Sequence, residues 1–129
     1  MRTVKFAMTS REFTKREQLK YSDGNASIKL DEVLQEYVDG GKDFIVTPTG
    51  YAVLDIHNDE VKREDGKKDY KAFIFETNDG KLYTTGSKTF MDAFLNIWNT
   101  MEGEEYEIRV IRKDSTNYKG KYFLTCAIV

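Results

Sequence analysis

Residues 70–101 read YKAFIFETNDGKLYTTGSKTFMDAFLNIWNTM, and this stretch decides the predicted fold. Residues 70–77 are rich in aromatic and branched side chains, which predicts a β-strand. The Asn-Asp-Gly step at residues 78–80 is typical of a tight turn into a second strand over residues 81–85. Across residues 87–101 the apolar side chains recur at steps of three and four, as on one face of an α-helix. The stretch therefore predicts a hairpin followed directly by a helix.

Three further strands are predicted around this hairpin and helix. Residues 44–56 form a longer apolar run that Pro48 and Gly50 interrupt, which suits a strand bent by a bulge. After the helix, residues 106–113 and residues 122–129 are rich in branched and aromatic side chains and predict a second strand pair.

The resulting order is three strands, one helix and two strands. Ser87 has the chemistry of a helix N-cap, and Gly103 is placed to adopt a left-handed conformation after the last turn, so both ends of the helix are marked. This order is typical of the OB-fold, a five-stranded Greek-key barrel that commonly binds single-stranded nucleic acid or oligosaccharide. We expect a mainly β fold with such a barrel over residues 43–129 and its helix between the third and fourth strands.

Residues 1–42 differ in sequence pattern from the rest of the chain. We expect them to form a short helical extension packed on the barrel. Residues 9–12, Thr-Ser-Arg-Glu, have the spacing of a capping box, which predicts a helix over residues 13–21. Residues 27–38 offer a second helix with apolar side chains on one side.

Composition favours one globular domain in a reducing compartment. The chain has 129 residues, of which 40% are hydrophobic and 33% charged. No apolar run approaches the roughly 20 residues that a membrane span needs, and the start lacks the apolar content of a signal peptide. The single cysteine permits no internal disulfide. We therefore expect a cytoplasmic protein without a membrane partner.

Catalysis is not expected. His57 is the only histidine and falls in a charged connection between two predicted strands, which is a poor place for a catalytic base. Strand alternation makes Cys126 a buried apolar residue rather than a nucleophile. No histidine and cysteine set for zinc and no glycine-rich phosphate loop is present, so no metal or cofactor is predicted.

Three segments carry a resemblance to a known family. They are LYTTGSKTF at residues 82–90, GEEYEIRV at residues 103–110 and KGKYFLTC at residues 119–126. Together with shorter pieces at residues 14–17 and 27–29, they resemble the small single-stranded DNA-binding proteins of tailed phages of Gram-positive bacteria. The resemblance implies a non-catalytic OB-fold protein that coats single-stranded DNA in the host cytoplasm during phage or prophage replication or recombination, with other proteins of those processes as further partners.

A protein of this kind needs flat aromatic faces on which bases can stack. The predicted stacking residues are Tyr51, Tyr70, Tyr83 and Tyr118. Alternation would turn Tyr83 outward if Leu82 points inward. For Tyr70 and Tyr83, packing against neighbouring strands is an equal alternative. Tyr118 falls in the predicted loop between the last two strands, where a ligand contact is the stronger interpretation.

Such a protein also needs cations along the nucleic-acid backbone, although the net charge of this chain is −2. The predicted phosphate contacts are Lys71, Lys81, Lys88, Arg109, Arg112, Lys113, Lys119 and Lys121. Five of them fall in residues 106–129, where they oppose only two carboxylates. Any single surface lysine can serve solubility alone, so it is the clustering that favours a phosphate track. The alternative function is an OB-type protein-interaction domain whose exposed aromatic residues meet a protein partner.

Overall fold

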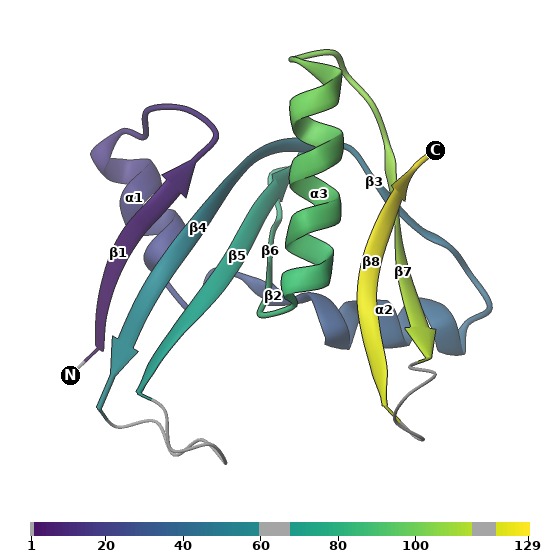
Figure 1. Ribbon diagram of the computed structural model, residues 1–129, viewed down its shortest axis with the longest axis horizontal. Coiled ribbons are helices and arrows are strands. Elements are labelled where there is room, and N and C mark those ends of the chain that lie inside the picture. The colour runs from purple at the N-terminus through teal and green to yellow at the C-terminus, as the bar shows by residue number, and fades with distance from the viewer. Residues whose placement is uncertain (1, 60–67, 115–120) are drawn as a thin grey trace.

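The computed structural model describes residues 2–59, 68–114 and 121–129 (Figure 1). Within them the chain forms three helices and eight strands. In chain order these are β1 (Arg2–Thr9), α1 (Lys15–Ser22), β2 (Ile28–Lys29), α2 (Leu30–Asp39), β3 (Phe44–Val46), β4 (Pro48–Asn58), β5 (Asp69–Thr77), β6 (Leu82–Thr85), α3 (Lys88–Met101), β7 (Ile108–Asp114) and β8 (Tyr122–Ile128). None of these helices is long and apolar enough to cross a membrane.

The strands form two sheets, and the fold is mixed α/β. A five-stranded sheet has the order β1-β4-β5-β6-β2, in which β2 runs parallel to β6 and the other pairs are antiparallel. A three-stranded antiparallel sheet has the order β3-β7-β8. Only Thr47 separates β3 from β4, so the chain passes from one sheet to the other at that point. Helix α3 stands between β5 and β8 (Figure 1).

The predicted closed OB barrel is wrong, because the described strands form two open sheets. Strand β6 pairs with β5 along one edge. Its other edge is occupied by β2, where Ile28 lies opposite Tyr83 and Lys29 opposite Thr84. A barrel would need this second edge to meet the three-stranded sheet. The short strand β2 therefore occupies the edge of β6 at which a barrel would have closed.

The individual elements predicted beyond residue 43 are present. The hairpin and the helix are β5, β6 and α3, and Ser87 caps α3 by accepting a hydrogen bond from the backbone N–H of Phe90 (3.1 Å). The helix ends at Met101 as predicted, and Gly103 has the predicted left-handed conformation with a φ of 86°, after Glu102 with a φ of 47°. Strand β4 shifts register between Pro48 and Gly50, as the bulge prediction required.

The N-terminal region is only partly the helical extension that was predicted. Residues 2–9 form the edge strand β1, paired with β4, and Val4 and Phe6 pack against buried residues with the alternation of a strand. The capping box lies at Thr14 and Glu17 rather than at residues 9–12, so α1 starts later than predicted. Helix α2 confirms the second predicted helix but begins three residues later than predicted, because Ile28–Lys29 form the strand β2.

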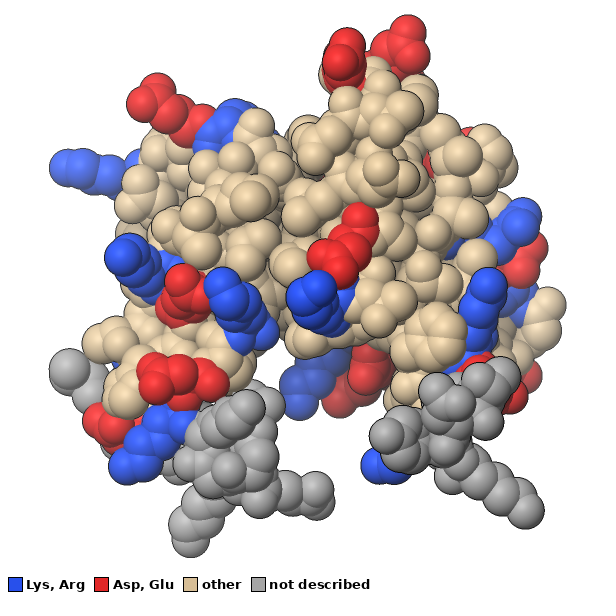
Figure 2. Space-filling model, in the orientation of Figure 1, with Lys and Arg blue, Asp and Glu red and all other residues tan. Residues whose placement is uncertain are grey.

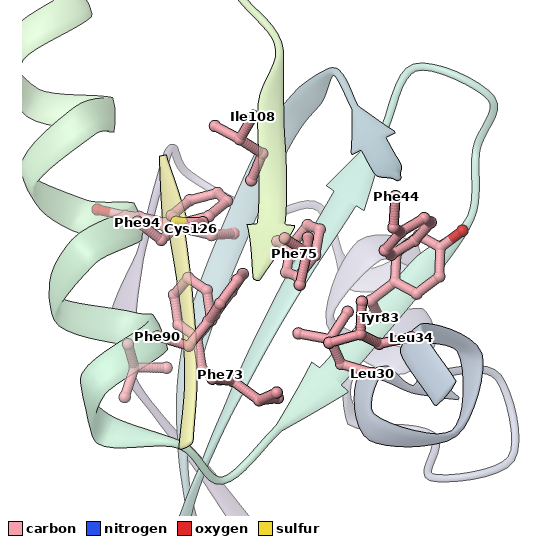
Figure 3. Close-up of a cluster of buried hydrophobic side chains, with 14 residues drawn as sticks. Leu30, Leu34, Phe44, Phe73, Phe75, Tyr83, Phe90, Phe94, Ile108 and Cys126 are labelled. Carbon is pink, nitrogen blue, oxygen red and sulfur yellow. The ribbon is translucent and has the colours of Figure 1, made fainter. Parts of the chain in front are cut away.

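Both faces of the five-stranded sheet are covered. The larger buried cluster lies between this sheet, the three-stranded sheet, α2 and α3 (Figure 3). In it the ring of Phe75 is stacked on Phe90 at 5.5 Å and on Tyr83 at 5.4 Å. The smaller cluster lies on the opposite face and includes Leu82 and, from α1, Tyr21. Neighbouring residues of β6 thus enter two different cores.

Phe75→Ala tests the larger cluster. The ring is fully buried, so its removal leaves a cavity, and we expect the free energy of unfolding to fall by about 3–5 kcal/mol. Urea denaturation measures the change. Leu19→Ala on α1, where the side chain is 73% exposed, is the control and should change stability by less than about 0.5 kcal/mol. Equal losses in the two variants would contradict the assignment of Phe75 to the core.

Candidate nucleic-acid interface

The predicted stacking residues Tyr51 and Tyr83 are buried, with side chains 6% and 3% exposed. The ring of Tyr51 lies 5.3 Å from Trp98 and 6.0 Å from Phe94, measured between centroids. Tyr83 is stacked on Phe75 and meets Phe44 edge-on at 5.5 Å. The prediction that these two rings face a ligand is therefore wrong.

The error at Tyr83 has a physical cause. Alternation does place Leu82 and Tyr83 on opposite faces of β6, as predicted. The inference to solvent exposure assumed a sheet with one wet face, whereas this sheet is packed on both faces. Alternation along β6 therefore places Leu82 in the smaller buried cluster and Tyr83 in the larger one.

Of the other two predicted stacking residues, Tyr70 and Tyr118, the structure describes only Tyr70. Tyr70 is half-buried and packs at the margin of the smaller cluster, which agrees with the cross-strand packing alternative. Tyr118 and the neighbouring cation Lys119 lie outside the described residues. Their predicted roles stay predictions.

Three of the predicted cations lie away from the end of the chain. Lys71 and Lys88 line one groove of about 470 Å³ between the five-stranded sheet and the start of α3. Each is close to a carboxylate, since Lys71 Nζ lies 3.2 Å from Asp55 and Lys88 Nζ lies 3.0 Å from Asp92. Lys81 lies beside the β5–β6 turn. This groove therefore presents cations whose charge is largely balanced.

The remaining described cations gather on β7 and at the start of β8 together with two exposed aromatic rings. We call the group Arg112, Lys113, Lys121, Tyr122 and Phe123 the basic hairpin end. Tyr122 is 47% exposed and Phe123 is 38% exposed. Basic side chains are visible on this side of the molecule in Figure 2.

Each ring of the basic hairpin end lies beside a cation. Lys113 is directly opposite Phe123 in the register of β7 and β8, so the two side chains share the outer face of the sheet. The guanidinium carbon of Arg112 lies 5.1 Å from the centroid of the Tyr122 ring. Arg112 also donates a hydrogen bond to the side chain of Gln35 on α2, which fixes its position. Phe123 and Lys113 thus lie on the outer face of the hairpin, and Tyr122 and Arg112 lie on its inner face, so each face has one ring beside one cation.

Charge is concentrated at this hairpin. Residues 108–114 and 121–128 contain four basic residues, namely Arg109 and three of the basic hairpin end, against Asp114 alone, a surplus of three. Since the whole chain has a net charge of −2, the rest of the sequence has a net charge of −5. Arg109 shares the outer face with Lys113 and lies 3.7 Å from Asp43. The net charge of the chain thus conceals a local basic surface.

Sequence reasoning missed Tyr122 and Phe123. Both were assigned to the last strand and given no ligand contact. A signal was present, because Leu124 and Cys126 alternate as buried residues and the same alternation turns Phe123 outward. Tyr122 is on the inner face but lies beyond the core, and sequence spacing does not show where the core ends.

The described residues include neither a cluster of metal ligands nor a readily ionised thiol. They contain no group of three or more histidine, cysteine, aspartate or glutamate side chains able to hold a metal ion. Burial raises the pKa of the Cys126 thiol to about 12, so this group stays protonated at neutral pH.

Comparison of this chain with protein-family models, with curated proteins and with solved structures gives no match.

His57 provides a test of the structure near the ends of β4 and β5. Its Nδ1 lies 2.7 Å from Asp69 and its Nε2 lies 2.7 Å from Asp59, and these hydrogen bonds raise the pKa of His57 above the ordinary value of 6.5. The protonated imidazole therefore stabilises the folded state. This contribution is fully present below pH 6.5 and is lost as the pH rises through the raised pKa of His57.

The imidazole signals of the only histidine can be followed by NMR against pH. We expect a pKa above 6.5 that moves downward in Asp69→Asn. Thr3→Ser on the facing strand β1 is the control and should leave the pKa where it is. A midpoint at or below 6.5 in the unmodified protein would contradict the two hydrogen bonds.

Proposed function

We propose that this chain binds single-stranded DNA, without catalysis and largely without sequence preference, at the basic hairpin end. The observation that carries the proposal is the pairing of each exposed ring with a cation, Lys113 with Phe123 and Arg112 with Tyr122. Such neighbours allow a base to stack on the ring while the adjacent phosphate meets the positive charge.

The set of proposed contacts differs from the one that the sequence predicted. Arg109, Arg112, Lys113 and Lys121 are kept, and Tyr122 and Phe123 replace the buried Tyr51 and Tyr83. Because every base has a flat π-face, stacking on these rings tolerates any sequence.

The charge distribution supports the same proposal. A surplus of three positive charges on β7 and β8 attracts a polyanion, while the remaining −5 repels it from other surfaces. DNA would therefore be held at one end of the molecule rather than wrapped around it. The resemblance to phage single-stranded DNA-binding proteins adds the proposed setting, which is phage or prophage replication or recombination in the host cytoplasm, alongside other proteins of those processes.

The anisotropy of a fluorescein-labelled oligo(dT) tests the proposal. We expect saturable binding that weakens steeply with salt, because bound cations release counterions. Phe123→Ala should weaken binding by about 1–3 kcal/mol if one base stacks on the ring. Lys113→Ala should reduce the slope of log affinity against log salt by about 0.7.

Two controls accompany these variants. Leu19→Ala removes an exposed apolar side chain on α1, and Lys42→Ala removes an exposed cation after α2, so both should bind as the unmodified protein does. Melting temperatures should be unchanged in all four proteins. The proposal fails if low salt produces no anisotropy change, or if the control variants weaken binding as much as Phe123→Ala and Lys113→Ala do.

A further inference from the structure

A second cavity lies at the opposite end of β7, where α3 ends. It has a volume of about 390 Å³, and its lining includes Pro48, Trp98, Tyr106, Glu104 and Glu105. We call it the acidic aromatic pocket. β7 starts beside it and ends at the basic hairpin end, six residues later, so the two sites lie roughly 20 Å apart.

The Trp98 ring is held firmly in the wall of this pocket. It is stacked on Phe94 with centroids 6.0 Å apart and lies 5.3 Å from Tyr51. The side chain is nevertheless only half-buried, because these contacts leave part of it to line the cavity. A fixed indole with an accessible part is a preorganised surface for a ligand.

The end of α3 brings carboxylates to the same pocket. Glu102 and Gly103 both have positive φ, 47° and 86°, and this turn reverses the chain so that Glu104 and Glu105 line the cavity. A side chain at Gly103 would have open space but a strained backbone, so glycine suits the turn for conformational reasons. The C-terminal end of α3 adds a partial negative charge of its own.

Among the residues that the structure describes, no cation pairs with Glu104 or Glu105. Residues 89–108 contain neither lysine nor arginine. The acidic residues in the same span are Asp92, Glu102, Glu104, Glu105 and Glu107. Asp92 pairs with Lys88, whereas the four glutamates have no ion pair in the described part of the chain. Figure 2 shows acidic side chains at this end of the molecule.

We infer that the acidic aromatic pocket binds an arginine side chain presented by a segment of a partner protein. A guanidinium is planar and weakly hydrated, so it stacks on an indole face, and it donates several hydrogen bonds to nearby carboxylates. Trp98 supplies the face, and Glu104 and Glu105 supply the acceptors. A polyanion is repelled by the same carboxylates, so this pocket selects a partner opposite in charge to the ligand of the basic hairpin end.

The inference does not depend on DNA binding, and Trp98 reports on it directly because it is the only tryptophan. The probe is acetylated tetra-arginine amide, titrated at about 0.15 M salt to suppress long-range attraction. We expect saturable change in Trp98 emission, and no change with tetra-citrulline, which has the same shape without the charge. Glu104→Gln combined with Glu105→Gln should weaken the binding of tetra-arginine by about tenfold.

The matched control is Asp31→Asn combined with Glu32→Gln, which removes two exposed carboxylates from the start of α2. This control should bind tetra-arginine as the unmodified protein does. Oligo(dT) anisotropy, measured in parallel, should not fall in the Glu104 and Glu105 double variant, so each proposal can fail alone. An equal response to citrulline, or equal losses in the two double variants, would overturn the inference. So would a lack of peptide response together with self-association that depends on Glu104 and Glu105, because the occupant would then be a second copy of this chain.

Discussion

Burial of both faces of the five-stranded sheet is the constraint on which the rest of this structure depends. β4 and β5 carry apolar side chains at successive positions, and α1 covers one face while α3 and the three-stranded sheet cover the other. A strand buried on both faces has no outward position for a ligand contact. Accessible aromatic rings are consequently found where packing is one-sided, at the start of β8.

The same constraint explains why the sheets stay open. The second edge of β6 is paired with β2, a strand of two residues, which leads directly into α2. Leu30 and Leu34 of α2 are buried in the larger cluster, so the pairing and the helix are fixed together. The apolar volume that a barrel would enclose is filled instead by α2, α3 and the two sheets, and Thr47 lets one run of chain serve both sheets.

Local signals in the sequence predicted most of the individual elements. They did not predict which strands pair when those strands are far apart in the chain. The Asn-Asp-Gly turn, the N-cap at Ser87 and the interrupted run at Pro48 each depend on neighbours in sequence, and each was confirmed. The pairing of Ile28 with Tyr83 joins residues far apart in the chain, and no periodicity records it. The cations on β7 were predicted because basic residues cluster in that part of the sequence. The exposure of Phe123 could be inferred only by knowing which face of β8 is covered.

Separation of charge along β7 gives the molecule two ends of opposite character. The basic hairpin end and the acidic aromatic pocket both combine aromatic rings with charge, positive in the first and negative in the second. Two sites roughly 20 Å apart are separated by more than the screening length of about 8 Å at physiological salt. The two proposed ligands would therefore be held by local contacts at each end, and an overall charge of −2 describes neither end. Under the two proposals, an anionic polymer at one end and a cationic segment at the other would not compete, because their sites share no residue.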